Sequence, residues 1–156
     1  MQEDGKMGSY GRFAAMIVVS TAVMFGLMYL NTYELDHVFF SQTRAWMALI
    51  MGATMAIVML AFMRGMYKDA RINAAIYGGS ALVFILALWL VRSQATVDDV
   101  SYMRAMIPHH SIAILTSERA GITDPRVRTL ADGIIATQKK EIAEMKLLIS
   151  DLSRSR

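Results

Sequence analysis

Residues 103–115 read MRAMIPHHSIAIL, and this stretch sets the pattern for the C-terminal third of the chain. Because successive residues of a helix are rotated by about 100°, Met103, Met106 and His110 would lie along one face. His109 lies a third of a turn away from that face. A helix built only for packing would carry Leu or Ile at positions 106 and 110. The pattern therefore suggests a soft-metal site of thioether and imidazole, and a packed histidine beside core methionines is the alternative.

The composition of the whole chain bounds what else it can be. Of the 156 residues 55% are hydrophobic, and the mean hydropathy of +0.39 is too high for one ordinary soluble domain. There is no cysteine, which excludes disulfides, thiolate metal sites, iron–sulfur clusters and cysteine nucleophiles. Residues 97–156 carry 9 Lys/Arg against 8 Asp/Glu, without a basic run interleaved with aromatics, so no nucleic-acid partner is expected.

Three uncharged runs predict membrane helices. They cover residues 13–30, 45–63 and 74–91. Each is about 27 Å or more in length as a helix, which is enough to cross the hydrocarbon core of a lipid bilayer. No Ala-x-Ala-like cleavage site follows the first run, which favours a retained helix over a signal peptide. We therefore expect a polar tail at 1–12 and a three-span membrane domain at 13–91.

Positive charges predict the orientation of these spans. The loop at 64–73 has three Lys/Arg, the tail at 1–12 has two and the loop at 31–44 has one. The positive-inside rule places the N-terminus and the second loop in the cytoplasm. We expect a multi-pass protein of the bacterial inner membrane, with residues 97–156 as a periplasmic domain. Because no histidine falls inside a span, a bis-histidine haem within the membrane is not expected.

The second span carries two regular rows of residues. Methionine recurs at every fourth position, at Met47, Met51, Met55, Met59 and Met63. A parallel row of small residues consists of Ala48, Gly52 and Ala56. The small row predicts close helix contact. The methionines are compatible with a thioether ladder for Cu(I), but we favour their use as packing because no charged or polar residue marks a pathway.

The C-terminal domain is expected to form a two-helix hairpin. One helix is predicted from a Thr96 cap to about residue 120, and the next opens at Asp124. Gln138 and Glu141 interrupt the apolar stripe of the second helix, where burial without partners costs free energy. They are either ligands or supporting groups of the Met/His site, or a pair that closes a local hydrogen bond.

Two segments of this hairpin resemble a known family. They are MIPHHSIAILTSERA at 106–120 and TLADGIIATQKKEIAEM at 129–145. They resemble the bacterial domain of unknown function 305 family, which is marked by a Met-x-x-His-His segment and a Gln-x-x-Glu-Ile-x-x-Met helix. That family is similar to ferritin-like helical bundles, and some members are associated with periplasmic copper binding or resistance. The resemblance implicates Met106, His109, His110, Gln138, Glu141 and Met145, and the helical stripe adds Met103.

The donor types indicate copper rather than other metals. Thioether sulfur is soft and imidazole is borderline, a mixture that suits Cu(I) or Cu(II) more than Mg or Ca. Ferritin-like di-iron chemistry needs Glu-x-x-His pairs, but Met106 and Ile107 stand three residues before the two histidines. Ser111 lacks a recognisable nucleophile context. We therefore expect no enzyme activity.

The expected whole is an all-α protein with three transmembrane helices and an outward-facing hairpin, half of a ferritin-like bundle, that binds copper in metal homeostasis or resistance. The alternative is a structural or interaction subunit that docks on a larger membrane complex and binds no metal. Because so small a hairpin with wide apolar stripes buries little surface alone, we expect a homodimer or higher homo-oligomer. Packing of the hairpin onto Phe39 and Phe40 of the first loop is the rival.

Overall fold

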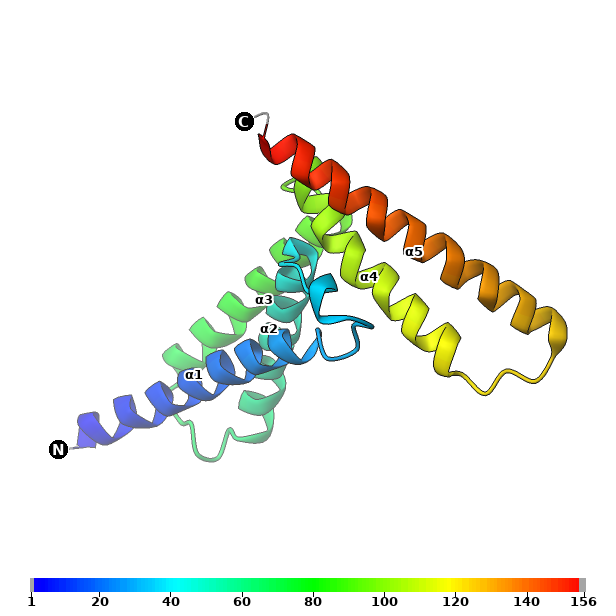
Figure 1. Cartoon of the computed structure of the whole chain (residues 1–156). Coiled ribbons are helices and arrows are strands. Elements are labelled where there is room, and N and C mark those ends of the chain that lie inside the picture. The colour runs from blue at the N-terminus through cyan, green and yellow to red at the C-terminus, as the bar shows by residue number, and fades with distance from the viewer. Residues whose placement is uncertain (1, 155–156) are drawn as a thin grey trace. The chain divides into compact units, whose positions relative to one another are not determined.

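The computed structural model describes residues 2–154, which form five α-helices, one short 3-10 helix and no strand (Figure 1). The elements are α1 (Gln2–Leu27), η1 (Leu35–His37), α2 (Gln42–Phe62), α3 (Ala70–Ser93), α4 (Asp99–Arg119) and α5 (Pro125–Arg154). The all-α expectation is confirmed for these residues. Two compact units divide the chain. One comprises α1 with Thr43–Ala95, and the other comprises Met28–Gln42 with the segment from Thr96 onward.

The first unit holds three helices that are long and apolar enough to cross a membrane, Gly8–Leu27, Gln42–Phe62 and Ala70–Ser93. Helix α1 begins at Gln2, so residues 2–12, which were expected to form a separate tail, continue the first helix. Helix α3 begins four residues before the uncharged run because Asp69 caps it. The Asp69 Oδ1 atom accepts hydrogen bonds from the backbone N–H groups of residues 71 and 72 at 3.0 and 3.1 Å.

Small residues allow α2 to approach α1 closely. Ala48, Gly52 and Ala56 are all buried, as the row of small residues predicts. A Cβ atom added at Gly52 would lie 2.3 Å from the Oγ1 atom of Thr21 on α1, far inside van der Waals contact. The hydroxyl of Thr21 donates to the Ile17 carbonyl at 2.7 Å, so its oxygen is already held in place. Close helix contact at this row is therefore confirmed.

Methionines at the end of α2 and just after it contribute to packing. The apolar cluster of this unit consists of Phe13, Ala56, Leu60 and Tyr67. Met59 and Met63 are partly buried against it. Their thioethers fill space beside aromatic rings, which is the use of methionine that the sequence favoured over a metal ladder.

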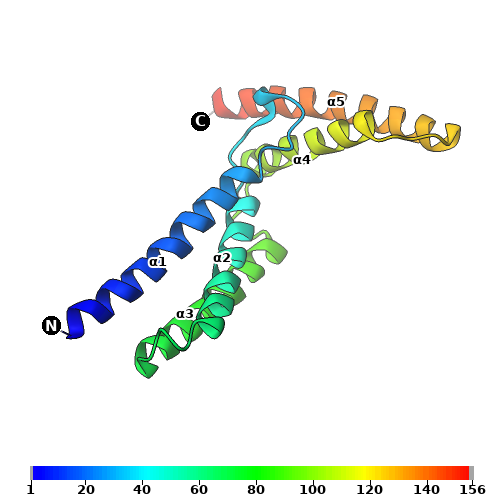
Figure 2. The ribbon, with the colours of Figure 1, turned by 90° about the horizontal axis from the view of Figure 1, so that it is seen from below.

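The second unit is built on an antiparallel helix pair. Figures 1 and 2 both show α4 and α5 side by side and running in opposite directions. Helix α4 is capped by Asp98, whose Oδ1 accepts the Ser101 N–H at 2.8 Å. The expected Thr96 cap is therefore wrong, and the stronger carboxylate acceptor takes the position two residues later. Helix α5 opens at Pro125 behind Asp124, which accepts the N–H of residue 126 at 2.8 Å, as predicted.

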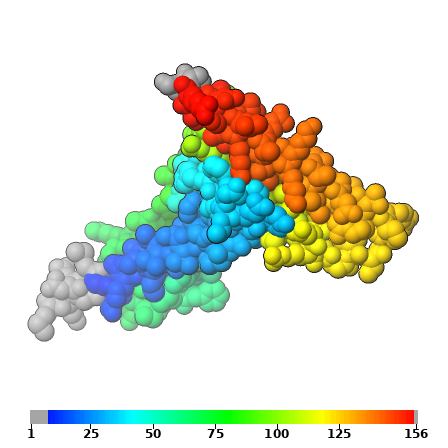
Figure 3. Space-filling model, viewed as in Figure 1, coloured from blue at the N-terminus to red at the C-terminus, as the bar shows by residue number. Residues whose placement is uncertain are grey.

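The loop that connects α1 and α2 belongs to this second unit. The hairpin core consists of Met103, Ile107, Ile114, Ile142 and Ile149. Tyr33 and Phe39 of the loop pack against that core, whereas Phe40 is 63% exposed. In Figure 3 the light-blue atoms of the loop lie against the yellow and orange atoms of α4 and α5. The rival expectation, that the loop covers the hairpin, is thus met by Phe39.

Candidate metal centre

An open groove of about 540 Å³ follows the hairpin and brings together part of the predicted site. From α4 it is lined by Asp99, Tyr102, Met103 and His110, and from α5 by Glu141, Glu144, Met145, Leu148, Asp151 and Leu152. Met103 and His110 stand seven residues apart, two helical turns, so they share one face of α4. The antiparallel α5 brings Glu141 and Met145, one turn apart, to the same groove. Four of the seven residues predicted for the site therefore line one surface.

The imidazole of His110 is the central group of this groove. Its side chain is 14% exposed, and its Nδ1 lies 3.1 Å from the Oε2 atom of Glu141. Although that distance is short, Nδ1 makes no aligned hydrogen bond within residues 2–154. Direction matters as much as distance in a hydrogen bond, so the contact leaves a buried nitrogen without a proper partner. A cation placed between this nitrogen and the carboxylate would satisfy both.

Burial lowers the pKa of His110 below its usual value, an effect that the charge of Glu141 opposes and that of His109 reinforces. The imidazole is therefore neutral at pH 7. Because a histidine must be neutral to bind a metal, the groove holds it in the competent form.

Gln138 and Glu141 form the local hydrogen bond that was one of the two interpretations offered by the sequence. The Gln138 Nε2 donates to the Glu141 Oε2 at 3.4 Å, which closes a local contact within α5. The same oxygen is the one that faces His110. Gln138 does not line the groove itself and contacts the groove only through this carboxylate.

The remaining predicted residues are placed differently. His109 is exposed, and its ring centroid lies 6.0 Å from that of His110. Met106 is half-buried and is not among the groove residues. Met103 and Met145 also contact the apolar core, so their thioethers pack and line the groove at once. The His-His pair is thus divided between one groove residue and one surface residue.

Sequence reasoning missed two sets of acidic residues. Asp99, Glu144 and Asp151 line the groove. Asp99 could have been predicted from its spacing, because it lies one helical turn before Met103 on the same face of α4. A second set consists of Glu34, Asp36 and His37 on the loop, whose ligand-type atoms all lie within 4.8 Å of one another. Three such residues within four positions were visible in the sequence, but no periodicity tied the loop to the hairpin.

The groove offers imidazole nitrogen, carboxylate oxygen and thioether sulfur. This donor mixture fits a soft or borderline cation, and copper in either oxidation state accepts all three donor types. Magnesium and calcium prefer oxygen ligands throughout, so the sulfurs and the imidazole would be of little use to them.

Comparison with known proteins finds a family model that matches the hairpin. Residues 99–156 match the family model described as domain of unknown function, DUF305. An uncharacterized protein from Acanthamoeba polyphaga mimivirus is 39% identical over 71 residues, which cover 44% of this chain and 47% of that protein. The match thus spans about half the length of that relative. No solved structure shows a significant match. Over residues 99–156, which contain every residue of the groove, the chain is similar to the DUF305 domain, and the resemblance seen in the sequence is confirmed at the level of the domain family.

Proposed function

We propose that this chain is a membrane-anchored copper-binding protein that acts in metal homeostasis or resistance. The observation that carries the proposal is the buried Nδ1 of His110, which faces Glu141 at 3.1 Å without an aligned hydrogen bond. The open groove around it holds the two thioether side chains of Met103 and Met145. These donors support a site for Cu(I) or Cu(II). In this proposal the exposed His109, next to His110, captures the ion at the surface.

Copper affinity of the full chain in mild detergent tests this function. Competition with a Cu(I) chelator should show that His110→Ala weakens binding at least tenfold, since removal of even an outer partner of a metal ligand costs about 10–100-fold. Met103→Leu and Met145→Leu keep the apolar volume and remove the sulfur, so each should weaken Cu(I) more than Cu(II). Met66→Leu, at an exposed methionine of the α2–α3 connection, is the matched control and should change nothing.

An unchanged copper affinity in a folded His110→Ala variant would reject the groove. The alternative function, a structural or interaction subunit that binds no metal, would then be favoured.

We further propose that the three candidate spans lie in a bacterial inner membrane with the hairpin in the periplasm. The excess of Lys/Arg in the α2–α3 connection supports this orientation. Single cysteines in this cysteine-free chain test it. Gly121→Cys, in the exposed α4–α5 connection, should react with an impermeant thiol reagent in intact spheroplasts. Lys68→Cys should react only after the membrane is opened, and the reverse pattern would place the groove in the cytoplasm.

We also propose that two hairpins pair about a two-fold axis. Apolar residues of α5 remain uncovered in the single chain, among them Leu130, which is 64% exposed, and Leu147, which is 68% exposed. A second copy would complete a four-helix bundle and cover them. Mass measurement in mild detergent should give a dimer, and Leu130→Glu with Leu147→Glu should give a monomer. A monomeric, helical parent protein would favour another partner for this face.

A further inference from the structure

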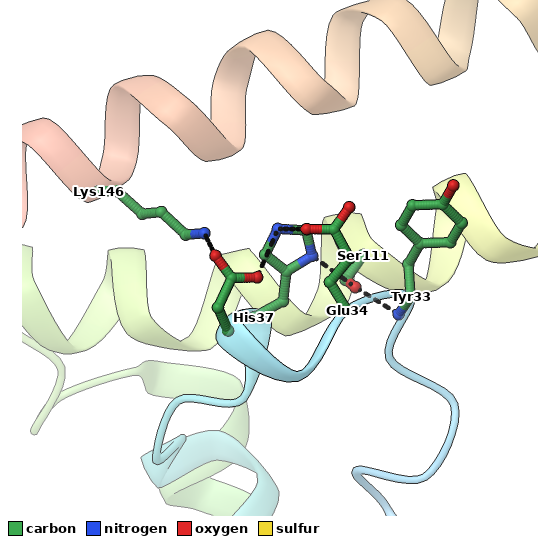
Figure 4. Close-up of polar contacts among 6 residues, drawn as sticks. Tyr33, Glu34, His37, Ser111 and Lys146 are labelled. Atoms are coloured by element: carbon green, nitrogen blue, oxygen red, sulfur yellow. Dashed lines mark hydrogen bonds and ion pairs between the residues drawn. The ribbon is translucent and has the colours of Figure 1, made fainter.

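A second histidine lies on the loop Met28–Gln42, outside the groove. His37 is only 6% exposed, because the loop packs it against α4. Its Nδ1 lies 3.0 Å from the Oγ of Ser111, and the same Oγ accepts the backbone N–H of Tyr33 at 2.7 Å. The hydroxyl therefore fixes both the orientation of the imidazole and the path of the loop (Figure 4).

The other ring nitrogen points to two carboxylates. The Nε2 of His37 lies 3.7 Å from the Oε2 of Glu34 and 3.6 Å from the Oδ1 of Asp36. These distances are too long for hydrogen bonds. Two ligand atoms that each bind one ion at about 2.1 Å stand about 3.4 Å apart at a tetrahedral angle. The spacing thus suits atoms that share a cation better than atoms that bond to each other.

Groups from both hairpin helices contact the atoms of Asp36 and His37 that face away from the cluster. Lys146 of α5 donates to Asp36 Oδ2, the oxygen turned away from His37, at 2.5 Å. Ser111 of α4 holds the Nδ1 of His37. Metal-binding histidines and carboxylates commonly have such partners on their second atoms, which fix the ring and aim the carboxylate. Two carboxylates and one ammonium leave a net charge of −1 to attract a cation.

We propose that Glu34, Asp36 and His37 form a second metal site, distinct from the copper groove, that binds Zn²⁺ and fastens the loop to the hairpin. One imidazole and two carboxylates without sulfur are harder donors than those of the groove and suit zinc. The side chains of Glu34 and Asp36 are 56% and 65% exposed, which leaves room for water as a fourth ligand. An ion bound here stabilises the docked loop because Ser111 and Lys146 orient His37 and Asp36 only in that state.

Zinc titration of the full chain in detergent, with zinc chloride and a chromophoric indicator as competitor, tests the site. Glu34→Gln and Asp36→Asn change exposed groups without loss of volume, and each should lower the zinc affinity at least tenfold. Asp132→Asn, at an exposed carboxylate of α5 that pairs with Arg128, is the matched control and should leave zinc affinity unchanged. Hydrogen exchange gives a second measurement: zinc should slow exchange in residues 28–42 of the parent and not in the Glu34→Gln, Asp36→Asn double variant.

Removal of His110 in the groove and of the neighbouring His109 separates this inference from the proposed function. The His109→Ala, His110→Ala double variant should lose copper binding and keep the zinc protection of the loop. Zinc affinity and loop protection that persist in the Glu34→Gln, Asp36→Asn variant would overturn the proposal. So would protection by zinc that maps to the groove instead of the loop.

Discussion

His110 and Ser111 are neighbours on α4 and face two different chemical surroundings. His110 lies in a groove with thioether sulfur and a carboxylate, while Ser111 holds His37 among the carboxylates of the loop. Consecutive side chains of a helix diverge by about 100°, so one turn of α4 can serve both faces. The difference shows that α4 borders two surroundings with different donor atoms, which include sulfur on one side and only nitrogen and oxygen on the other. Under the two proposals above, each side would select a different class of cation.

Both faces of α4 should be lost together if the apolar core that they share is disrupted. Ile114 is fully buried between the two faces, and Ile114→Ala should lower the free energy of unfolding of the hairpin by about 2–5 kcal/mol. Both metal affinities should fall together. Hydrogen exchange of residues 97–154 measures the effect. Leu60→Ala, equally buried in the first unit, is the matched control and should leave exchange in the hairpin unchanged. Loss of one affinity alone would show that the faces do not depend on one core.

Removal of the hydroxyl that holds the loop should affect one face only. Ser111→Ala leaves the Tyr33 N–H and the His37 Nδ1 without their partner, at a cost of about 1–3 kcal/mol. We expect faster exchange in residues 28–42 and weaker zinc binding, with copper affinity retained. A variant in which copper affinity falls by the same factor would mean that the two faces are coupled.

Acidification should lower the free energy of unfolding through the histidines of both faces. Burial lowers the pKa values of His37 and His110 below the ordinary value, and Lys146 adds to the effect at His37. The unfolded chain therefore binds more protons near pH 6 than the folded chain does. This contribution to stability is complete above the unfolded pKa of about 6.5 and is lost as the pH falls toward and below the folded values.

Each unit of pKa depression is worth about 1.4 kcal/mol. Unfolding of the metal-free protein followed between pH 7.5 and 5 should show this loss, and His37→Gln and His110→Gln should each reduce it. A profile that both substitutions leave unchanged would assign the acid sensitivity to other groups.

The smallest effect is expected at the ion pair of the loop. Lys146→Met removes the bond to Asp36 but keeps most of the apolar stem, and both groups are partly exposed to solvent. We expect a loss of only about 0–1 kcal/mol in stability. Thermal unfolding of the metal-free variant at low and high salt measures it, and the difference from the parent should shrink as salt rises. A loss above this range would show that the pair is the principal link between loop and hairpin.

The sequence predicted those features that depend on local pattern. Uncharged apolar runs predicted the three candidate spans. The row of small residues that includes Gly52 predicted the close contact with α1. Helical periodicity brought Met103 and His110 together, and the antiparallel hairpin supplied Glu141 and Met145. These predictions hold because each rests on the geometry of one helix or of two helices joined by a short turn.

What the sequence could not predict depends on contacts between distant segments. Nothing local to His37 indicates that Ser111, 74 positions later, will hold its ring. The loop carries no periodicity, so its docking surface is invisible until the hairpin has been placed. The position of His109 outside the groove could not be predicted for a different reason, since a doubled histidine says nothing about which of the two turns toward the groove.

The docking of the loop has a consequence for the order of events during synthesis. Asp36 leaves the ribosome long before Lys146, its partner 110 positions later. His37 likewise emerges before its partner Ser111. Contacts between segments so far apart form slowly because a large loop must first be closed. The segment after α1 therefore cannot complete its contacts until the last helix has emerged with Lys146. Completion of the chain is then the event that closes this unit, and a truncated product that lacks α5 would display an unfinished apolar surface.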